Sequence, residues 1–412
     1  MQTSPLDSLE TLLPARLLRV VKRDTPIPTI AARAAALKKE RPSLVRSDIG
    51  QISELDPSLE VLYGPPVGME ELRKVLAETW NITLGLRERP LEGLPDGLKP
   101  EHVAVCTGAA EGLTLLFAML AHEKVVGLPR GHWENYSNGV DMAGGRSVLV
   151  DFFDAEGQLN IEGLRQQLQS QNIRLLVVNF PCNPTGAVLT AAEVQALGKL
   201  LEETNTLAIA DEVYWRLRYD LEPPNSLLTA APGHVVVVSS ASKEYLLPGA
   251  RVGYVISTRS SFTDGALRKL IRASTASPNV PGQQRLLALM KDELVFLKRG
   301  EAPPLLTRVR DEMALRKARL VEILDKHGFT MVGRPGHVPM GTIFLMAGLP
   351  AWWKGSDIAF VEKALETATV SVIPGTAFAL ERSVRFSFGG MTTAAIEQLD
   401  INLTQMRALV EG

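Results

Sequence analysis

Cysteine and histidine are scarce in this sequence of 412 residues. Its two cysteines, Cys106 and Cys182, exclude a disulfide framework and a multi-cysteine metal site. The six histidines are scattered, and no two of them have the i, i+4 spacing of a helical zinc site. We therefore expect no metal site and a cytoplasmic location. Residues 1–7 contain neither a basic segment nor an apolar core, so we also expect no signal peptide.

The sequence also lacks a strong excess of one charge and a long apolar run. Lys and Arg number 44 against 46 Asp and Glu, so we expect neither nucleic acid nor an anionic membrane as a partner. One of the longest apolar runs, residues 113–121, is too short to span a bilayer. The length and the apolar share of 45% predict a globular protein with two domains, or with one large and one small lobe.

Apolar runs that alternate with helical patterns predict the fold. The runs that we interpret as strands are at 102–106, 175–180, 207–210, 235–238 and 252–256. Helical patterns such as 113–121 and 194–201 lie between them, and another, 69–80, precedes them, which favours a mainly parallel sheet covered on both faces. After residue 290 the pattern changes to a long helix with short strands, at 307–327, 342–346, 369–373 and 384–388.

We therefore expect an α/β fold with two parts. The large domain, residues 60–290, is predicted to be a three-layer α-β-α structure with a mainly parallel sheet. The smaller α+β domain is predicted to combine both chain ends, residues 1–59 and 291–412.

Polar residues follow three of the predicted strands. Asn183 lies in the turn after 175–180, Asp211 ends the run 207–210, and Lys243 follows 235–238. Because the carboxyl ends of parallel strands lie on one edge of a sheet, these residues can converge on one ligand. Each also has an ordinary interpretation, namely a turn asparagine, a helix N-cap and an exposed loop lysine. Taken singly, the residues do not decide between the two.

Two further features could bind an anion. Arg251 lies eight positions after Lys243, behind a Pro-Gly turn, as expected for an anion pocket beside a Schiff-base lysine. A helix that starts within 107–112 would expose free backbone N–H groups to a phosphate, although Thr107 could simply be its N-cap. The run 240–243 also fits the S-x-x-K motif of serine β-lactamases. That interpretation is weak, since no Lys-Thr-Gly follows and Tyr-Ser-Asn at 136–138 precedes the motif.

Five motifs occur in an order that matches a known family. They are Phe-Pro-Cys-Asn-Pro-Thr-Gly at 180–186, Asp-Glu-Val-Tyr at 211–214, Ser-Ala-Ser-Lys at 240–243, Pro-Gly-Ala-Arg-Val-Gly at 248–253 and Arg-Phe-Ser-Phe-Gly-Gly at 385–390. The ordered set resembles the class I/II aminotransferases of fold type I, the aspartate aminotransferase superfamily, which depend on pyridoxal 5′-phosphate. The resemblance implies ping-pong transfer of an amino group between an amino acid and a 2-oxo acid.

The resemblance also implies roles for the matching residues. Lys243 would form the Schiff base and act as general base, and Asp211 would pair with the pyridinium nitrogen. Tyr214 and Asn183 would bind the phenolic oxygen of the cofactor. The other implied contacts are ring stacking by Trp133, phosphate binding by Gly108, Ala109, Ala110, Ser240, Ser242 and Arg251, a contact across a homodimer interface by Tyr63, and substrate binding by Gly50, Asn183 and Arg385.

The sequence departs from the family pattern at two places. Phe180 replaces a residue that is usually polar. Ala109 and Ala110, with Glu111, replace the usual polar side chains of the phosphate loop and leave phosphate binding there to backbone N–H groups. Acidic, aromatic and neutral substrates all stay open, because Arg272 is only a weak candidate for a second carboxylate-binding arginine. A pyridoxal-phosphate lyase, cyclase or β/γ-replacement enzyme of the same fold is the alternative, because these reactions also begin with loss of the Cα proton.

Overall fold

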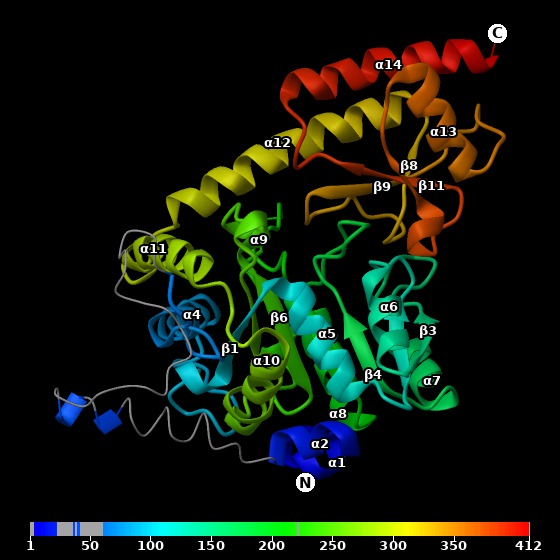
Figure 1. The fold of residues 1–412 in the computed structure, drawn as a ribbon. Coiled ribbons are helices and arrows are strands. Elements are labelled where there is room, and N and C mark those ends of the chain that lie inside the picture. Colours follow the sequence, from blue (N-terminus) through cyan, green and yellow to red (C-terminus); the bar gives the residue numbers. More distant parts are fainter. Residues whose placement is uncertain (1–3, 23–35, 38, 42–60, 221, 412) are drawn as a thin grey trace.

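A seven-stranded, mainly parallel sheet forms the centre of the protein (Figure 1). The computed structural model describes residues 4–22, 36–37, 39–41, 61–220 and 222–411. In the described chain the strand order is β1-β7-β6-β5-β4-β2-β3, and β3, β2, β4, β5 and β6 are mutually parallel. The strands are β1 (Val103–Cys106), β2 (Val125–Pro129), β3 (Arg146–Val150), β4 (Ile173–Val178), β5 (Leu207–Asp211), β6 (Val235–Ser240) and β7 (Gly253–Ile256).

The strand side chains alternate between two separate cores, which confirms the predicted three layers. In β6, Val235 and Val237 belong to one apolar cluster, and Val236 and Val238 belong to the other. The first cluster is shared with α4 (Glu70–Leu84), α7 (Ile161–Ser170), α8 (Ala191–Glu203) and α11 (Val280–Leu297). The second is shared with α5 (Gly108–Leu120), α6 (Asn135–Met142) and α10 (Arg268–Thr275).

Strand β7 differs from the β-α-β pattern that the sequence suggested for it. It is antiparallel to both of its neighbours, β1 and β6. The connection from β6 holds only the four-residue helix α9 (Ala241–Glu244) and a 3-10 turn at Pro248–Ala250. Since a parallel crossover needs a longer connection, usually a full helix, the chain returns in the opposite direction.

The smaller unit has a sheet and a core of its own. Its antiparallel sheet has the order β10-β11-β9-β8. The strands are β8 (Thr330–Met331), β9 (Phe344–Gly348), β10 (Ile373–Pro374) and β11 (Ser383–Ser387), and the helices are α12 (Pro304–Lys326), α13 (Asp357–Ala368) and α14 (Thr393–Glu411). Leu320, Phe360 and Phe386 lie in its core, so the expected α+β character is confirmed. None of the described helices is long and apolar enough to cross a bilayer.

The amino-terminal helices pack on the large sheet, at the end opposite the smaller unit (Figure 1). They are α1 (Leu9–Leu12) and α2 (Ala15–Lys22). Leu12 and Val21 join the core that contains Phe117 of α5, because that core offers apolar partners to these residues. Residues 4–22 therefore do not belong to the smaller unit, in contrast to the expectation for 1–59. The rest of the proposed division stays a prediction.

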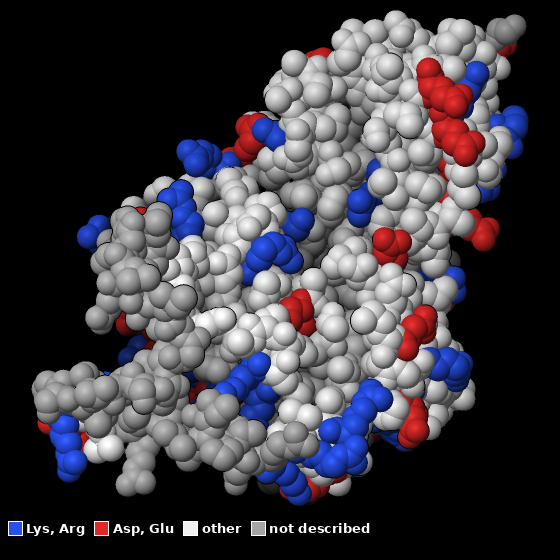
Figure 2. Space-filling model, in the orientation of Figure 1, with Lys and Arg blue, Asp and Glu red and all other residues white. Residues whose placement is uncertain are grey.

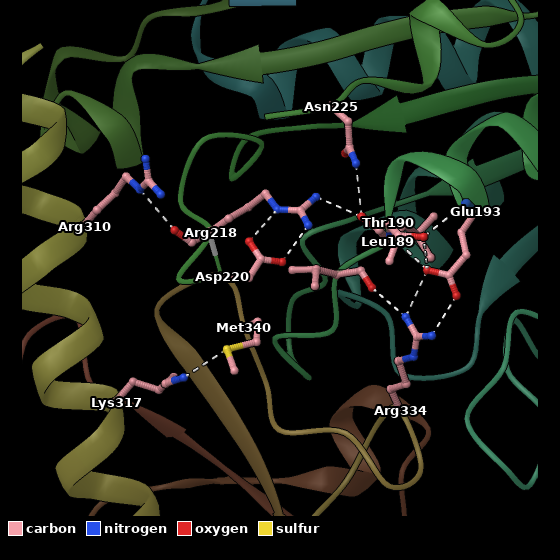
Figure 3. A network of polar contacts seen from close by, with 11 residues as sticks. Leu189, Thr190, Glu193, Arg218, Asp220, Asn225, Arg310, Lys317, Arg334 and Met340 are labelled. Atoms are coloured by element: carbon pink, nitrogen blue, oxygen red, sulfur yellow. Dashed lines mark hydrogen bonds and ion pairs between the residues drawn. The ribbon is translucent and has the colours of Figure 1, made fainter. Parts of the chain in front are cut away.

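Polar contacts connect the two units near the carboxyl edge of the large sheet (Figure 3). Arg334 binds both carboxylate oxygens of Glu193, at 2.7 and 3.1 Å. Arg310 of α12 donates to the carbonyl oxygen of Arg218 at 3.1 Å. The guanidinium of Arg218 is buried and pairs with Asp220. These contacts fix the smaller unit beside the loop that follows β5.

Candidate active site

The three residues predicted to converge do lie at one edge of the large sheet. Asp211 is the last residue of β5, Asn183 lies in the loop after β4, and Lys243 lies in α9 directly after β6. Arg385 of β11 comes from the smaller unit and donates to the amide oxygen of Asn183 at 3.1 Å. The ammonium nitrogen of Lys243 lies 5.5 Å from the ring centre of Tyr214. The site therefore combines both units.

Asp211 is a buried carboxylate that forms no ion pair with any described residue. It is 3% exposed, and the hydroxyl of Tyr136 donates to its Oδ2 at 2.6 Å. The backbone N–H of Val213 donates to its Oδ1 at 3.3 Å. Burial raises the pKa of Asp211 to about 6, although these hydrogen bonds and the charge of Lys243 act in the opposite direction. A protonated ring nitrogen beside Asp211 would supply the missing positive charge.

Lys243 is partly withdrawn from solvent. Burial is the main cause that lowers the pKa of its amine, and the charge of Arg385 lowers it further. Asp211 opposes this shift. A lower pKa makes the neutral amine, which is the form that attacks a carbonyl or accepts a proton, more populated near neutral pH.

The guanidinium of Arg385 lies close to two aromatic rings. Its guanidinium carbon lies 4.2 Å from the ring centre of Phe344 and 4.7 Å from that of Phe378. Its Nε is buried and has no hydrogen-bond partner among the residues that the structure describes. None of the ion pairs of the described chain includes Arg385, so its planar guanidinium can receive a carboxylate.

The start of α5 forms a close cradle with Arg251. Gly108 has a φ of +76°, and a Cβ placed on it would lie 2.4 Å from Nη2 of Arg251. A Cβ on Gly253 would lie 2.3 Å from the backbone nitrogen of Ala109. The guanidinium thus lies against the helix start, where free N–H groups favour an anion. Ser240, which is buried, accepts a hydrogen bond from the N–H of Ser242 at 3.3 Å.

An open cavity of about 580 Å³ lies between α9 and α12, beside Lys243. Its lining includes Lys243, Leu217, Met313, Ile343 and Arg316. Figure 2 shows Lys and Arg side chains around the recess between the smaller unit and the large sheet. The Arg316 guanidinium is already paired with Glu312 at 2.8 Å.

Comparisons with known proteins match this geometry. Residues 30–399 match the family Aminotransferase class I and II. The chain belongs to this family. An aspartate/prephenate aminotransferase of Thermus thermophilus is 29% identical over 396 residues, which cover 90% of this chain and 94% of the relative. An aspartate aminotransferase of Bacillus subtilis is 27% identical, covering 85% and 84%.

Solved structures show the same fold. A mutant aspartate aminotransferase of Thermus thermophilus superposes with a TM-score of 0.72 at 27% identity, covering 98% of this chain and 99% of that one. An aromatic aminotransferase of Pyrococcus horikoshii has a TM-score of 0.71 at 25% identity, covering 95% and 93%. The family and these relatives make the protein an aminotransferase, so the lyase, cyclase and replacement alternatives are not favoured.

The other predicted residues of the aminotransferase have different surroundings. Trp133 is partly buried and meets Tyr136 edge-on, with ring centres 5.9 Å apart. Tyr214 is buried, whereas Tyr63 is 71% exposed in the single chain. Gly50 lies outside the described residues. A serine nucleophile of the S-x-x-K type would need a hydrogen bond between Ser240 and Lys243. The region that the structure describes contains no such bond.

Both departures from the family pattern have a local explanation in this aminotransferase. Phe180 packs edge-on against Phe152 and Phe153, with ring centres 5.3 and 5.8 Å apart. Glu111 turns back to the start of α5, where its carboxylate accepts from the N–H of Thr107 at 2.5 Å and from the hydroxyl of Ser274 at 2.8 Å. These contacts occupy both of its oxygens.

Sequence reasoning missed two polar contacts in the aminotransferase. In the sequence, Tyr136 was noted only as part of the Tyr-Ser-Asn triplet, although its hydroxyl binds Asp211. Glu244, which follows Lys243, is buried against Arg216. No spacing rule links residues so far apart in the chain. The charged Arg216 inside the apolar segment 213–217 was nevertheless a usable signal of a buried ion pair.

Proposed function

We propose that this aminotransferase binds pyridoxal 5′-phosphate at the carboxyl edge of the large sheet and uses Lys243 as the covalent attachment point. The observation that carries the proposal is the convergence of three groups. They are the buried carboxylate of Asp211, the partly desolvated amine of Lys243 and the guanidinium of Arg385, whose Nε is left to bind a carboxylate. The amino group would move between an amino acid and a 2-oxo acid in two half-reactions of a ping-pong cycle.

The residues of the site fit this cofactor. Its phosphate would lie at the start of α5, against Arg251 and the N–H groups of Ala109 and Ala110, with Ser240 and Ser242 close by in the chain. Gly108 permits this approach because it has no Cβ. Asp211 would hold the ring nitrogen in its protonated state. Trp133, Asn183 and Tyr214 are proposed to contact the ring and its phenolic oxygen. When bound, the cofactor supplies an electron sink for negative charge at the substrate Cα.

Lys243 is proposed to move the proton. Its lowered amine pKa keeps a share of the side chain neutral at the pH of the reaction, so that Nζ can accept a proton from the substrate Cα and then donate it at another carbon, as transfer of the amino group requires. Such positioned proton transfer typically contributes roughly 10²–10⁴-fold. Asp211, held by Tyr136, would keep its charge fixed while Lys243 changes its protonation state.

Arg385 is proposed to bind the α-carboxylate of the substrate. The two aromatic rings fix the plane of its guanidinium, and Asn183 holds one of its nitrogen atoms. A planar, fixed guanidinium can form two parallel hydrogen bonds to a carboxylate. This orientation would place the Cα beside Lys243. Gly50 remains a proposed substrate contact.

The substrate class, the assembly and the location are proposals as well. Relatives are named for aspartate, prephenate and aromatic substrates, so aspartate and aromatic amino acids are tested first as amino donors and prephenate as a 2-oxo acid acceptor. A homodimer is proposed because Tyr63 is largely exposed in the single chain and would reach the site of a partner subunit. The large and small domains are proposed to close on the substrate, and the enzyme is proposed to act in the cytoplasm.

A panel of amino donors with several 2-oxo acids tests the proposal. The purified enzyme loaded with pyridoxal phosphate should convert a donor to its 2-oxo acid only when an acceptor is present, and initial rates should give the parallel double-reciprocal lines of a ping-pong cycle. Lys243→Ala should abolish this turnover. Release of ammonia without an acceptor, or full turnover by Lys243→Ala, would refute the proposed function.

A further inference from the structure

A buried ionic cluster lies directly behind Lys243. Arg216 binds the carboxylate of Glu244 at 2.6 Å and also pairs with Glu293. The hydroxyl of Tyr245 accepts from Arg216 at 2.8 Å and donates to Glu293 at 2.6 Å. All four side chains are at most 6% exposed. The cluster is distinct from the groups that would touch the cofactor or the substrate.

The cluster joins three elements of the large domain. Arg216 comes from the loop after β5, two residues beyond Tyr214. Glu244 and Tyr245 come from α9 and its C-cap, and Glu293 comes from α11. The loop that carries Tyr214 and the helix that carries Lys243 are therefore bound to each other and to a long helix behind them.

Helix α9 depends on such anchoring. It has four residues, and a helix of this length is unstable by itself in water. Lys243 and Glu244 are adjacent, so their side chains leave the helix about 100° apart, as the helical repeat requires. Lys243 enters the cleft while Glu244 enters the core. The position of the amine is thus coupled to the ion pair of its neighbour.

We propose that Glu244, through Arg216 and Glu293, is a positioning residue that holds Lys243 in register with Tyr214 and Asp211. Its carboxylate makes no contact with reacting atoms and acts through the helix. One of its oxygens, Oε1, is buried without a partner, so the second oxygen and the Arg216 guanidinium carry the connection. The inference rests on the proposed role of Lys243.

The test compares Glu244→Ala with two matched variants. Glu244→Gln keeps an oxygen that can accept from Arg216, so it should restore most of the function. Asp220→Ala is the control, because it removes a carboxylate from the buried Arg218 in the same loop without touching α9. In Glu244→Ala, Arg216 keeps Glu293 and Tyr245 as partners, so the fold should persist.

The first measurement is the rate at which the apo protein binds pyridoxal phosphate covalently, followed by visible absorbance across a pH range. Glu244→Ala should attach the cofactor and turn over roughly 10- to 100-fold more slowly, the cost of a small misplacement of a reacting group. Its KM should stay within about 2-fold, because substrate binding uses Arg385. Urea unfolding of each apo variant reports stability separately.

Several outcomes decide between the explanations. Slow attachment in Glu244→Ala, recovery in Glu244→Gln and a normal rate in Asp220→Ala would support the positioning role. Wild-type rates in Glu244→Ala, or an equal loss in Asp220→Ala, would overturn it. If the wild-type protein attaches no cofactor, or if Lys243→Ala still does, then the proposed function fails, and the role of Glu244 fails with it.

Discussion

The hydroxyl of Tyr136 donates a 2.6 Å hydrogen bond to the buried carboxylate of Asp211. Tyr136 is 1% exposed, and the ring of His132 stacks on it with ring centres 6.4 Å apart. The hydrogen bond stabilises the charged form of Asp211 and so lowers its pKa against the effect of burial. The charge state of Asp211, which ends β5, therefore depends on Tyr136 in a different element, α6.

Tyr136→Phe should weaken the enzyme by removing this hydrogen bond. Hydrogen bonds to charged groups contribute about 1.5–3 kcal/mol, so we expect a loss of about 10- to 100-fold in kcat/KM. The pKa of Asp211 should rise, which moves the acidic limb of the pH profile to higher pH. Tyr219→Phe removes a hydroxyl that binds the carbonyl of Thr342 instead, and serves as control. An unchanged acidic limb in Tyr136→Phe would contradict the role of this hydrogen bond.

The stability of the apo protein should depend on pH through Asp211. Its folded-state pKa of about 6 lies above the ordinary value of 3.8, so the folded state binds a proton more tightly than the unfolded state. The stabilisation is complete below about pH 4 and is lost as the pH rises through about 6. The shift corresponds to roughly 2–3 kcal/mol.

Asp211→Asn should remove this dependence. Measured by urea unfolding of the apo proteins at about pH 4.5 and about pH 7.5, on either side of the folded-state pKa, the variant should gain stability relative to wild type as the pH rises. Glu212 is also buried with a raised pKa and is present in both proteins, and because burial is the main cause of its shift, most of its effect cancels in the comparison. A constant difference across this range would mean that Asp211 is not a desolvated carboxylate.

Arg385→Lys should impair substrate binding and leave cofactor binding intact. A lysine keeps the charge but cannot form two parallel hydrogen bonds or place a planar guanidinium against Phe344 and Phe378. We expect KM to rise by roughly 10- to 100-fold for every substrate that has an α-carboxylate. Arg382→Lys, an exposed arginine just before β11, should change little. Equal effects in the two variants would argue against a specific carboxylate site.

Gly108→Ala should weaken binding of the cofactor phosphate. The new Cβ would collide with Arg251 at 2.4 Å, in addition to the strain of a positive φ. Gly300→Ala separates the two effects, because Gly300 has a similar φ of +71° and nothing within 4 Å of its Cβ position. The first variant should raise the dissociation constant of pyridoxal phosphate by about 10-fold or more. The second should lower only the stability, by about 1 kcal/mol.

Five of the seven strands of the large sheet, and the edge that they share, could be predicted because they follow from local patterns, whereas β2 and β3 were not predicted. Apolar runs such as 235–238 indicated the strands, and polar residues at their ends indicated Asp211 and Lys243. The direction of β7 was missed because it depends on the length of the β6–β7 connection. The packing of Leu12 and Val21 on the large sheet was missed because an amphipathic helix does not specify which core it joins.

The partners of the site residues could not be predicted for a related reason. Tyr136 and Asp211 are 75 positions apart, and Arg216 and Glu293 are 77 apart. Their contacts arise only when the sheet places α6 beside the end of β5 and α11 beside the loop that follows β5. The residue types were visible in the sequence, but their pairing depends on tertiary structure.

The most direct test of the account is the identity of the lysine that carries the cofactor. The protein loaded with pyridoxal phosphate is reduced with borohydride, digested, and the labelled peptide is mapped by mass spectrometry. Lys317 is an internal comparison, since burial also lowers its amine pKa but it binds the carbonyl of Pro339. We expect a single label, on Lys243, which disappears in Lys243→Ala. A label on Lys317 or on another lysine, or none at all, would contradict it.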